Sequence, residues 1–211
     1  MKKRLGLLLV DFDGVMSNSR FYETDALEDR EFSDKAKEFI FSQENTVVLN
    51  SWMRGAICYQ EVHRLAEQAK GLSAKRLDHL LHQSVINMDL NKLMLSYVKY
   101  LRENGVTVGL FTNNMDVFDS ISRYHFNLDK YFNHIYSSSA YGQLKLENDT
   151  IIRKVIDDTH VHIDEVALVD DSQSSFDTAT KYGIATFLYR NYKESQVEFE
   201  TWIEKNYSLT D

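Results

Sequence analysis

The feature that most constrains this chain is the stretch Leu7–Met16, LLLVDFDGVM, in which an apolar run stops at two aspartates. A continuous aliphatic run without polar alternation is typical of a strand that is buried on both faces, at the centre of a parallel sheet. Because side chains alternate along an extended segment, Asp11 and Asp13 are expected on one side and Phe12 on the other, toward the core. Gly14 then lets the chain leave the strand sharply.

A surface turn that closes a β-hairpin is the alternative interpretation of Asp-Phe-Asp-Gly. A hairpin requires a second strand directly after the turn, whereas residues 17–30 are polar and irregular. The sequence therefore favours the end of a buried strand that carries two carboxylates.

Composition restricts the class of protein. The 211 residues suffice for one sizeable domain, or for a core with a smaller inserted module. The net charge of −8 argues against a nucleic-acid-binding protein and against attachment to an anionic membrane surface, because both need clustered lysine and arginine. Small anionic substrates are compatible with local positive charge. The composition leaves the oligomeric state open.

The expected location is the cytoplasm. Cys58 is the single cysteine and cannot form an internal disulfide, which fits a reducing environment. The apolar run near the amino terminus is too short for a signal peptide and is followed at once by charge. No later segment has the length of apolar sequence that spans a bilayer, so a soluble protein is predicted.

Residues 17–84 differ in character from the first strand, because their apolar residues recur at helical spacing. Ser33 is expected to cap one of these helices, and Gly71 to end another. The segment is predicted to be a small helical bundle inserted after the first strand. Residues 1–16 and 85–211 are then assigned to an α/β core domain, and residues 17–84 to the inserted helical domain.

The remainder of the chain alternates amphipathic helices with short apolar strands. After the first strand, further strands are expected at 106–111, 134–136, 166–169 and 186–189, with a helix at 117–124 and a polar loop at 137–139. This alternation predicts a Rossmann-like parallel sheet that is covered by helices on both faces and connected by right-handed crossovers. The fold class is therefore α/β with a helical insert.

Polar residues follow three of the predicted strands: Asp11 and Asp13, Thr112 and Asn113, and Asp170 and Asp171. In parallel sheets of this type, ligands bind beyond the carboxyl ends of the strands. Each motif alone is a weak signal. Carboxylates and a hydroxyl at equivalent ends of separate strands together predict one functional site.

The residue types at these strand ends indicate the chemistry. Four aspartates brought together repel one another unless a cation lies among them. Hard oxygen ligands without histidine or cysteine favour Mg²⁺, which usually keeps several waters and takes its other contacts from carboxylates and a phosphate oxygen. The predicted substrate is therefore a phosphate.

A second group of residues suits phosphate binding. Lys145, in a loop expected on the same side of the sheet, and the Thr112 hydroxyl can hold phosphate oxygens. Asp11 can then attack the phosphorus to give an aspartyl-phosphate, while Asp13 protonates the leaving group and later takes a proton from water. A solvated surface lysine is the alternative interpretation of Lys145.

Four segments resemble, in order, the four motifs of the haloacid dehalogenase (HAD) superfamily: DFDGVM, FTNN, GQLKLENDTII and ALVDDS. The resemblance covers almost the whole chain. The helical insert, with SWMRGAICYQEV inside it, resembles the α-helical cap of that superfamily's phosphatases and dehalogenases. The segments HIYSSSAYGQLKLEN and VALVDDSQSSFDTATKYGIATFLY are most similar to its sugar-phosphate phosphatases, which include glucose-1-phosphate phosphatases.

The resemblance implies a HAD fold with a cap and a set of site residues. It implies Asp11 as the nucleophile and Asp13 as the acid/base. The implied magnesium ligands are Asp11, the backbone carbonyl of Asp13 and Asp170, with Asp171 assisting; the implied phosphate-binding residues are Thr112, Asn113 and Lys145. The expected function is a magnesium-dependent phosphatase that hydrolyses a small phosphorylated metabolite, such as a sugar phosphate, through an aspartyl-phosphate.

The chain departs from the superfamily pattern at two places. Leu146 follows the motif lysine where the family usually has proline, which predicts a changed loop with retained chemistry. Ser174 and Ser175 stand where an additional acidic or amide residue is common, so the outer shell of the metal site is less defined.

Three other functions are compatible with this fold. Dehalogenases of the superfamily lack the second aspartate of the first motif, so Asp13 favours phosphoryl chemistry. A phosphomutase shares all four motifs, and a non-catalytic phosphate-binding protein would keep the fold without needing the full set. The cap is expected to open for substrate and close over it. Trp52 and Arg54 are candidates to face the cleft, although a buried Trp52 and a surface Arg54 are equally compatible.

Overall fold

The computed structural model describes residues 2–190 and 192–209. Its centre is a parallel sheet with the strand order β4-β3-β2-β5-β6. The strands are β2 (Leu7–Val10), β3 (Thr107–Thr112), β4 (His134–Ser137), β5 (Val166–Asp170) and β6 (Ala185–Leu188). The chain builds outward from β2 to one side through β3 and β4, and then to the other side through β5 and β6. The α/β fold class is confirmed, with β2 central as predicted.

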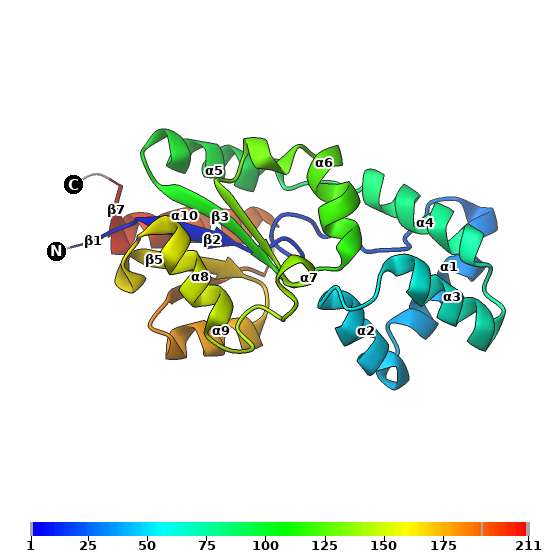
Figure 1. Cartoon of the computed structure of the whole chain (residues 1–211). Helices are drawn as coiled ribbons and strands as arrows, with labels where there is room; N and C mark the ends of the chain where they lie inside the picture. Colours follow the sequence, from blue (N-terminus) through cyan, green and yellow to red (C-terminus); the bar gives the residue numbers. More distant parts are fainter. Residues whose placement is uncertain (1, 191, 210–211) are drawn as a thin grey trace.

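Helices cover both faces of the sheet (Figure 1). They are α5 (Lys92–Glu103), α8 (Thr150–Thr159), α9 (Gln173–Lys181) and α10 (Tyr192–Asn206). Leu8 and Val10 belong to the hydrophobic cluster that includes residues of α5 and α10, while Leu7 and Leu9 belong to the cluster with α8 and α9. Successive side chains of β2 thus pack into hydrophobic clusters on opposite faces of the sheet, which explains why the strand is apolar at every position.

Four longer helices lie between β2 and α5 and form the cap, beside the carboxyl ends of the strands (Figure 1). They are α1 (Arg30–Ile40), α2 (Thr46–Met53), α3 (Tyr59–Lys70) and α4 (Ala74–Ile86). Gly71 ends α3 with φ +67, as predicted. The prediction that Ser33 caps a helix is wrong: α1 begins one turn earlier, after a short 3-10 turn at Leu27–Asp29.

One local prediction in the core is also corrected, and another is refined. The predicted loop at 137–139 contains the start of a short helix, α7 (Ser138–Tyr141), because the Ser137 hydroxyl caps it by accepting a hydrogen bond from the Ala140 amide at 3.3 Å. The predicted helix at 117–124 is confirmed, but its middle is a π-helical turn at Phe118–Ser122, which continues into α6 (Arg123–His125). A short parallel sheet that pairs β1 (Lys3–Arg4) with β7 (Tyr207–Ser208) was not predicted.

The described part of the chain contains no helix that is both long and apolar enough to cross a bilayer.

A buried polar network joins the segment that enters the cap to its helices. Tyr22 has φ +63, and its backbone is held by Ser84, whose Oγ accepts from the amide at 2.9 Å, and by Ser33, whose Oγ donates to the carbonyl at 2.5 Å. The Tyr22 hydroxyl lies 2.7 Å from Nε2 of His63, and Nδ1 of His63 lies 2.5 Å from Asp78. A neutral imidazole that donates to Asp78 and accepts from Tyr22 satisfies all three groups.

Stability is therefore expected to depend on the protonation of His63. Burial lowers the pKa of His63 below 6.5, more than the carboxylate of Asp78 raises it. The unfolded state then binds the proton more readily, so the stabilising contribution is present above pH 6.5 and is lost as the pH falls. The contribution of His63 to the free energy of unfolding should decrease by up to about 1.4 kcal/mol per pH unit in this range.

Urea unfolding at pH 7.5 and 5.5 measures this effect. In His63→Gln the decrease between the two pH values should be smaller than in the wild type, whereas His79→Gln, which changes an exposed histidine of the same cap, should keep the wild-type decrease. Equal decreases in the wild type and His63→Gln would contradict the prediction.

Candidate active site

Asp11 lies directly after β2 and is 5 % exposed. Its Oδ1 accepts a hydrogen bond from the Phe12 amide at 2.8 Å, and its Oδ2 lies 2.6 Å from Nζ of Lys145. Phe12 points away into the core, where its ring packs edge-on against Phe118 with the centroids 5.1 Å apart. The predicted division of this segment, with carboxylates on one side and the aromatic ring on the other, matches these contacts.

Gly14 permits the close packing of the first and fourth motifs. Its φ is +76, and a Cβ at this position would lie 2.1 Å from Oδ2 of Asp171. Any side chain here would therefore displace Asp171, in addition to straining the backbone. Gly14 therefore allows the chain to turn sharply after β2 and also allows Asp171, which follows β5, to pack against this turn.

Asp13 is held by a residue that the sequence analysis did not single out. Nδ2 of Asn114 donates to Oδ2 of Asp13 at 3.0 Å, and Asn114 is fully buried. The side chain of the neighbouring Asn113, predicted to bind phosphate, accepts a hydrogen bond on Oδ1 from the Lys145 amide at 2.6 Å. The signal for Asn114 was its place beside Asn113 at the end of β3, but sequence alone does not tell which of two adjacent amides faces the carboxylates.

Lys145 is buried, 7 % exposed, and lies between two carboxylates. Its Nζ is 2.6 Å from Oδ2 of Asp11 and 2.7 Å from Oδ2 of Asp170. The interpretation of Lys145 as a solvated surface residue is therefore wrong. Leu146, which follows it, has φ +61, so the loop has a backbone conformation unlike that of a proline.

Asp170 and Asp171 lie at the end of β5, beside β2. Carboxylate oxygens of Asp11, Asp170 and Asp171 all lie within 4.8 Å of one another. Three hard oxygen donors at this spacing suit a magnesium ion, and no histidine or cysteine intervenes. The Asp13 carboxylate is outside this group of three and contacts Asn114 instead. The donor set therefore fits Mg²⁺, with Asp11, Asp170 and Asp171 as the carboxylates that would hold it.

Thr112 lies at the end of β3 and is completely buried. Its Oγ1 is one of the few buried side-chain atoms in the described residues without a hydrogen-bond partner. An unpaired buried hydroxyl costs free energy, so it marks a position where a ligand atom can accept or donate. A phosphate oxygen meets this requirement, as the sequence analysis expected of Thr112.

The electrostatics of the site follow from burial and from the crowding of charges. Burial raises the pKa of Asp11 to about 8, against the lowering effect of Lys145. Burial also raises the pKa of Asp13, to about 6, although Arg20 and Lys145 oppose the rise. Burial alone would lower the pKa of Lys145, but the carboxylates of Asp11 and Asp170 outweigh it and raise the pKa. Lys145 therefore stays charged and offsets part of the carboxylate repulsion.

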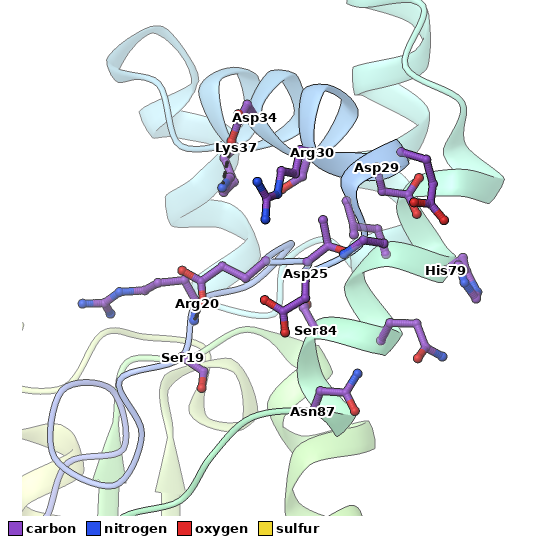
Figure 2. Close-up of a pocket in the computed structure, with 17 residues that line it drawn as sticks. Ser19, Arg20, Asp25, Asp29, Arg30, Asp34, Lys37, His79, Ser84 and Asn87 are labelled. Carbon is purple, nitrogen blue, oxygen red and sulfur yellow. Dashed lines mark hydrogen bonds and ion pairs between the residues drawn. The ribbon is translucent and has the colours of Figure 1, made fainter.

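Arg20 lines a cavity of about 890 Å³ in the cap (Figure 2). The cavity lies between the segment that enters the cap and helices α1 and α4, and its lining includes Arg20, Asp25, Arg30, Lys37, Ser84 and Asn87. The positive charge of Arg20 opposes the rise in the pKa of both Asp13 and Asp171. The sequence analysis missed Arg20, because nothing in the polar segment after the first motif distinguishes it from a solvated residue.

The two cap residues considered for the cleft contact the core. Trp52 is fully buried, and its Nε1 donates to Oδ1 of Asp116 at 2.6 Å. Nη2 of Arg54 donates to Oε1 of Glu147 at 2.7 Å, two residues after Lys145. Of the two interpretations, burial holds for Trp52, while Arg54 spans the interface between cap and core.

A match to a protein-family model shows which family the chain belongs to. The model described as haloacid dehalogenase-like hydrolase matches residues 8–189, which include all four motifs. The chain belongs to the haloacid dehalogenase-like hydrolases. The HAD resemblance drawn from the sequence is confirmed, and the chain is a hydrolase of this family. A search of curated proteins gave no match.

Solved structures share the HAD fold. A predicted HAD-like family hydrolase from Porphyromonas gingivalis superposes with a TM-score of 0.72 at 19 % identity, covering 97 % of this chain and 99 % of that one. The HAD family enzyme bt-2542 from Bacteroides thetaiotaomicron gives a TM-score of 0.70 at 22 % identity, covering 88 % and 94 %. A dehalogenase gives 0.62 at 14 % identity, covering 94 % and 96 %. These solved structures therefore share the fold of this chain over most of its length.

Proposed function

We propose that this hydrolase is a magnesium-dependent phosphatase that acts on small phosphate monoesters through an aspartyl-phosphate on Asp11. The observation that carries the proposal is the second carboxylate of the first motif: Asp13 lies outside the three-carboxylate group and is held by Asn114. A carboxylate in that place can exchange protons with a leaving group. The HAD enzyme bt-2542 has been solved with magnesium and inorganic phosphate, which supports the same ligands here.

The residues divide the reaction into two steps. In the first, a carboxylate oxygen of Asp11 attacks the phosphorus, the bond to the leaving oxygen breaks, and Asp13 donates its proton to that oxygen. In the second, Asp13 takes a proton from water, the water oxygen attacks the same phosphorus, and the bond to Asp11 breaks to release inorganic phosphate. A pKa of about 6 suits a group that gives and takes a proton near neutral pH.

The other residues hold the phosphoryl group in place. The charged Lys145 and the unpaired hydroxyl of Thr112 offer donors to its oxygens. Bound Mg²⁺ would neutralise carboxylate and phosphoryl charge, with Asp11, Asp170 and Asp171 as its carboxylate ligands. The similarity of residues 134–148 and 166–189 to sugar-phosphate phosphatases supports a small phosphorylated metabolite such as a sugar phosphate as the substrate.

Phosphate release from a panel of substrates tests this proposal. The panel contains sugar phosphates, phosphoglycolate, nucleotides and 4-nitrophenyl phosphate, each with Mg²⁺ and with EDTA. Release is expected with Mg²⁺ and should fall to the background with EDTA, because the carboxylates of Asp11 and Asp170 are otherwise occupied by Lys145. Chloride release from 2-chloroacids is assayed in parallel. Phosphate release that is independent of Mg²⁺, or halide release without phosphate release, would contradict the proposal.

A further inference from the structure

Residues 52–55, which end α2 and are called the docking turn here, carry several contacts between cap and core. Besides the bonds of Trp52 to Asp116 and of Arg54 to Glu147, the carbonyl of Met53 accepts a hydrogen bond from Oγ of Ser138 at 2.6 Å. Three successive residues of the cap therefore bond to three separate segments of the core.

One of these contacts leads to the acid/base. Oγ of Ser138, which touches the cap, also accepts from the backbone amide of Asn114 at 2.9 Å and lies 3.0 Å from the Asn114 carbonyl. The side chain of Asn114 in turn donates to Asp13 at 3.0 Å. A single buried hydroxyl thus contacts both the docking turn and the residue that orients Asp13.

A second contact leads to the catalytic lysine. Glu147 uses one carboxylate oxygen to accept from Arg54 and the other to accept from the amide of Leu144 at 3.2 Å. Leu144 directly precedes Lys145, so the carboxylate closes the loop that carries the lysine and ties it to the cap. If either Arg54 or Glu147 is replaced, the loop that carries Lys145 loses its bond to the cap and is held less firmly.

Gly55 allows the docking turn to lie this close. A Cβ on Gly55 would be 2.4 Å from the backbone carbonyl oxygen of Ser139, and the φ of Gly55 is +64. Backbone atoms on the core side cannot move aside as a flexible side chain would. The cap can therefore approach the core this closely at Gly55 only because glycine has no side chain.

We propose that the docking turn is a positioning element of the active site, which fixes Asp13 through Ser138 and Lys145 through Glu147 when it seats on the core. The acid/base and the lysine then take their working positions only in the docked state. This proposal rests on the proposed phosphatase function for its activity readout, and a second readout below is independent of activity.

Paired glycine variants test the close approach. Gly55→Ala should lower kcat by roughly tenfold or more, because small misplacements of catalytic groups have effects of this size or larger. Gly71→Ala is the matched control: its φ is +67, also in the cap, but a Cβ there would meet nothing within 4 Å. Both variants carry the same kind of backbone strain, and Gly55→Ala adds the clash with Ser139, so its melting temperature should fall at least as far as that of Gly71→Ala. Equal kcat in the two variants would overturn the proposal.

A double-mutant cycle tests the link to the lysine loop. Arg54→Gln and Glu147→Gln should each lower kcat roughly two- to fivefold, the range of a partly exposed ion pair, with little change in KM. The double variant should be no worse than either single variant. Arg123→Gln, which breaks an ion pair with Asp129 that involves no residue of the docking turn, should keep the wild-type kcat. A raised KM in Arg54→Gln with an unaffected Glu147→Gln would assign Arg54 to substrate binding and overturn the proposal.

Tryptophan fluorescence reports docking without any substrate. The chain has two tryptophans. Trp202 belongs to α10 and packs against Phe187 and Tyr207 in the core. Trp202→Phe therefore leaves Trp52 as the only tryptophan whose fluorescence is observed. In this background Gly55→Ala should shift the emission to longer wavelength and increase quenching by acrylamide, while Gly71→Ala should do neither. Unchanged fluorescence in Gly55→Ala would refute the docking role. If Gly55→Ala shifts the Trp52 emission as expected but the enzyme with the wild-type sequence releases phosphate from no compound of the panel, the docking role is supported and the phosphatase proposal is refuted.

Discussion

Replacing Asp11 by asparagine is expected to lower the kcat for phosphate release by roughly 10⁴-fold or more, the scale seen when a catalytic nucleophile is removed. The amide keeps the size of the side chain but cannot form the phosphoryl bond. Phosphate release from the best substrate of the panel, with saturating Mg²⁺, measures the loss. Asp157→Asn, an exposed aspartate on α8, controls for the loss of one negative charge and should keep the wild-type rate.

A direct observation of the intermediate sharpens this prediction. After rapid acid quenching of a turnover reaction, mass spectrometry of peptides should find a phosphoryl group on the peptide that contains Asp11 in the wild type and none in Asp11→Asn. A phosphorylated peptide elsewhere in the chain, or substantial activity in Asp11→Asn, would contradict Asp11 as the nucleophile.

Replacing Asp13 by asparagine is expected to lower kcat by roughly 10²- to 10⁴-fold, the usual contribution of a general acid or base. The loss should be larger for alkyl phosphates, whose leaving oxygen needs a proton, than for 4-nitrophenyl phosphate, whose leaving group is stable as an anion. With the aryl substrate the first step survives while the second is slow. A burst of nitrophenol followed by slow turnover is therefore expected.

Magnesium binding separates this effect from damage to the metal site. Because the Asp13 carboxylate lies outside the three-carboxylate group, titration calorimetry should give a similar affinity for Mg²⁺ in Asp13→Asn and the wild type. Full activity in Asp13→Asn, or equal losses for alkyl and aryl substrates, would contradict the acid/base assignment.

The sequence was most informative where one physical requirement determined the residue. The run Leu7–Val10 is apolar because both of its faces are covered, and Gly14 is needed because the chain leaves the strand with φ +76. These requirements are local, so the pattern alone predicted the central strand and its exit. The strand ends were likewise predictable, because a parallel sheet brings its carboxyl ends to one edge.

The features that sequence reasoning missed depend on side-chain directions, on helix packing or on a choice between local conformations. Asn114 and Arg20 act on Asp13 through side-chain directions that spacing does not determine. The short helix α7 forms in a serine-rich segment because Ser137 caps it, a choice that propensity leaves open. The burial of His63 depends on how the cap helices pack, and its helix position alone was compatible with a surface residue.

The left-handed backbone of Leu146 has a consequence for engineering this enzyme. Its φ of +61 is closed to proline, whose ring locks φ near −65°, so introducing the proline usual in the family would rearrange the loop instead of rigidifying it. The Leu146 side chain is buried in the same hydrophobic cluster as Ile151 and Ile152, which offsets the backbone strain. Consensus design, which normally adds stability by restoring common residues, would here work against the position of the catalytic lysine.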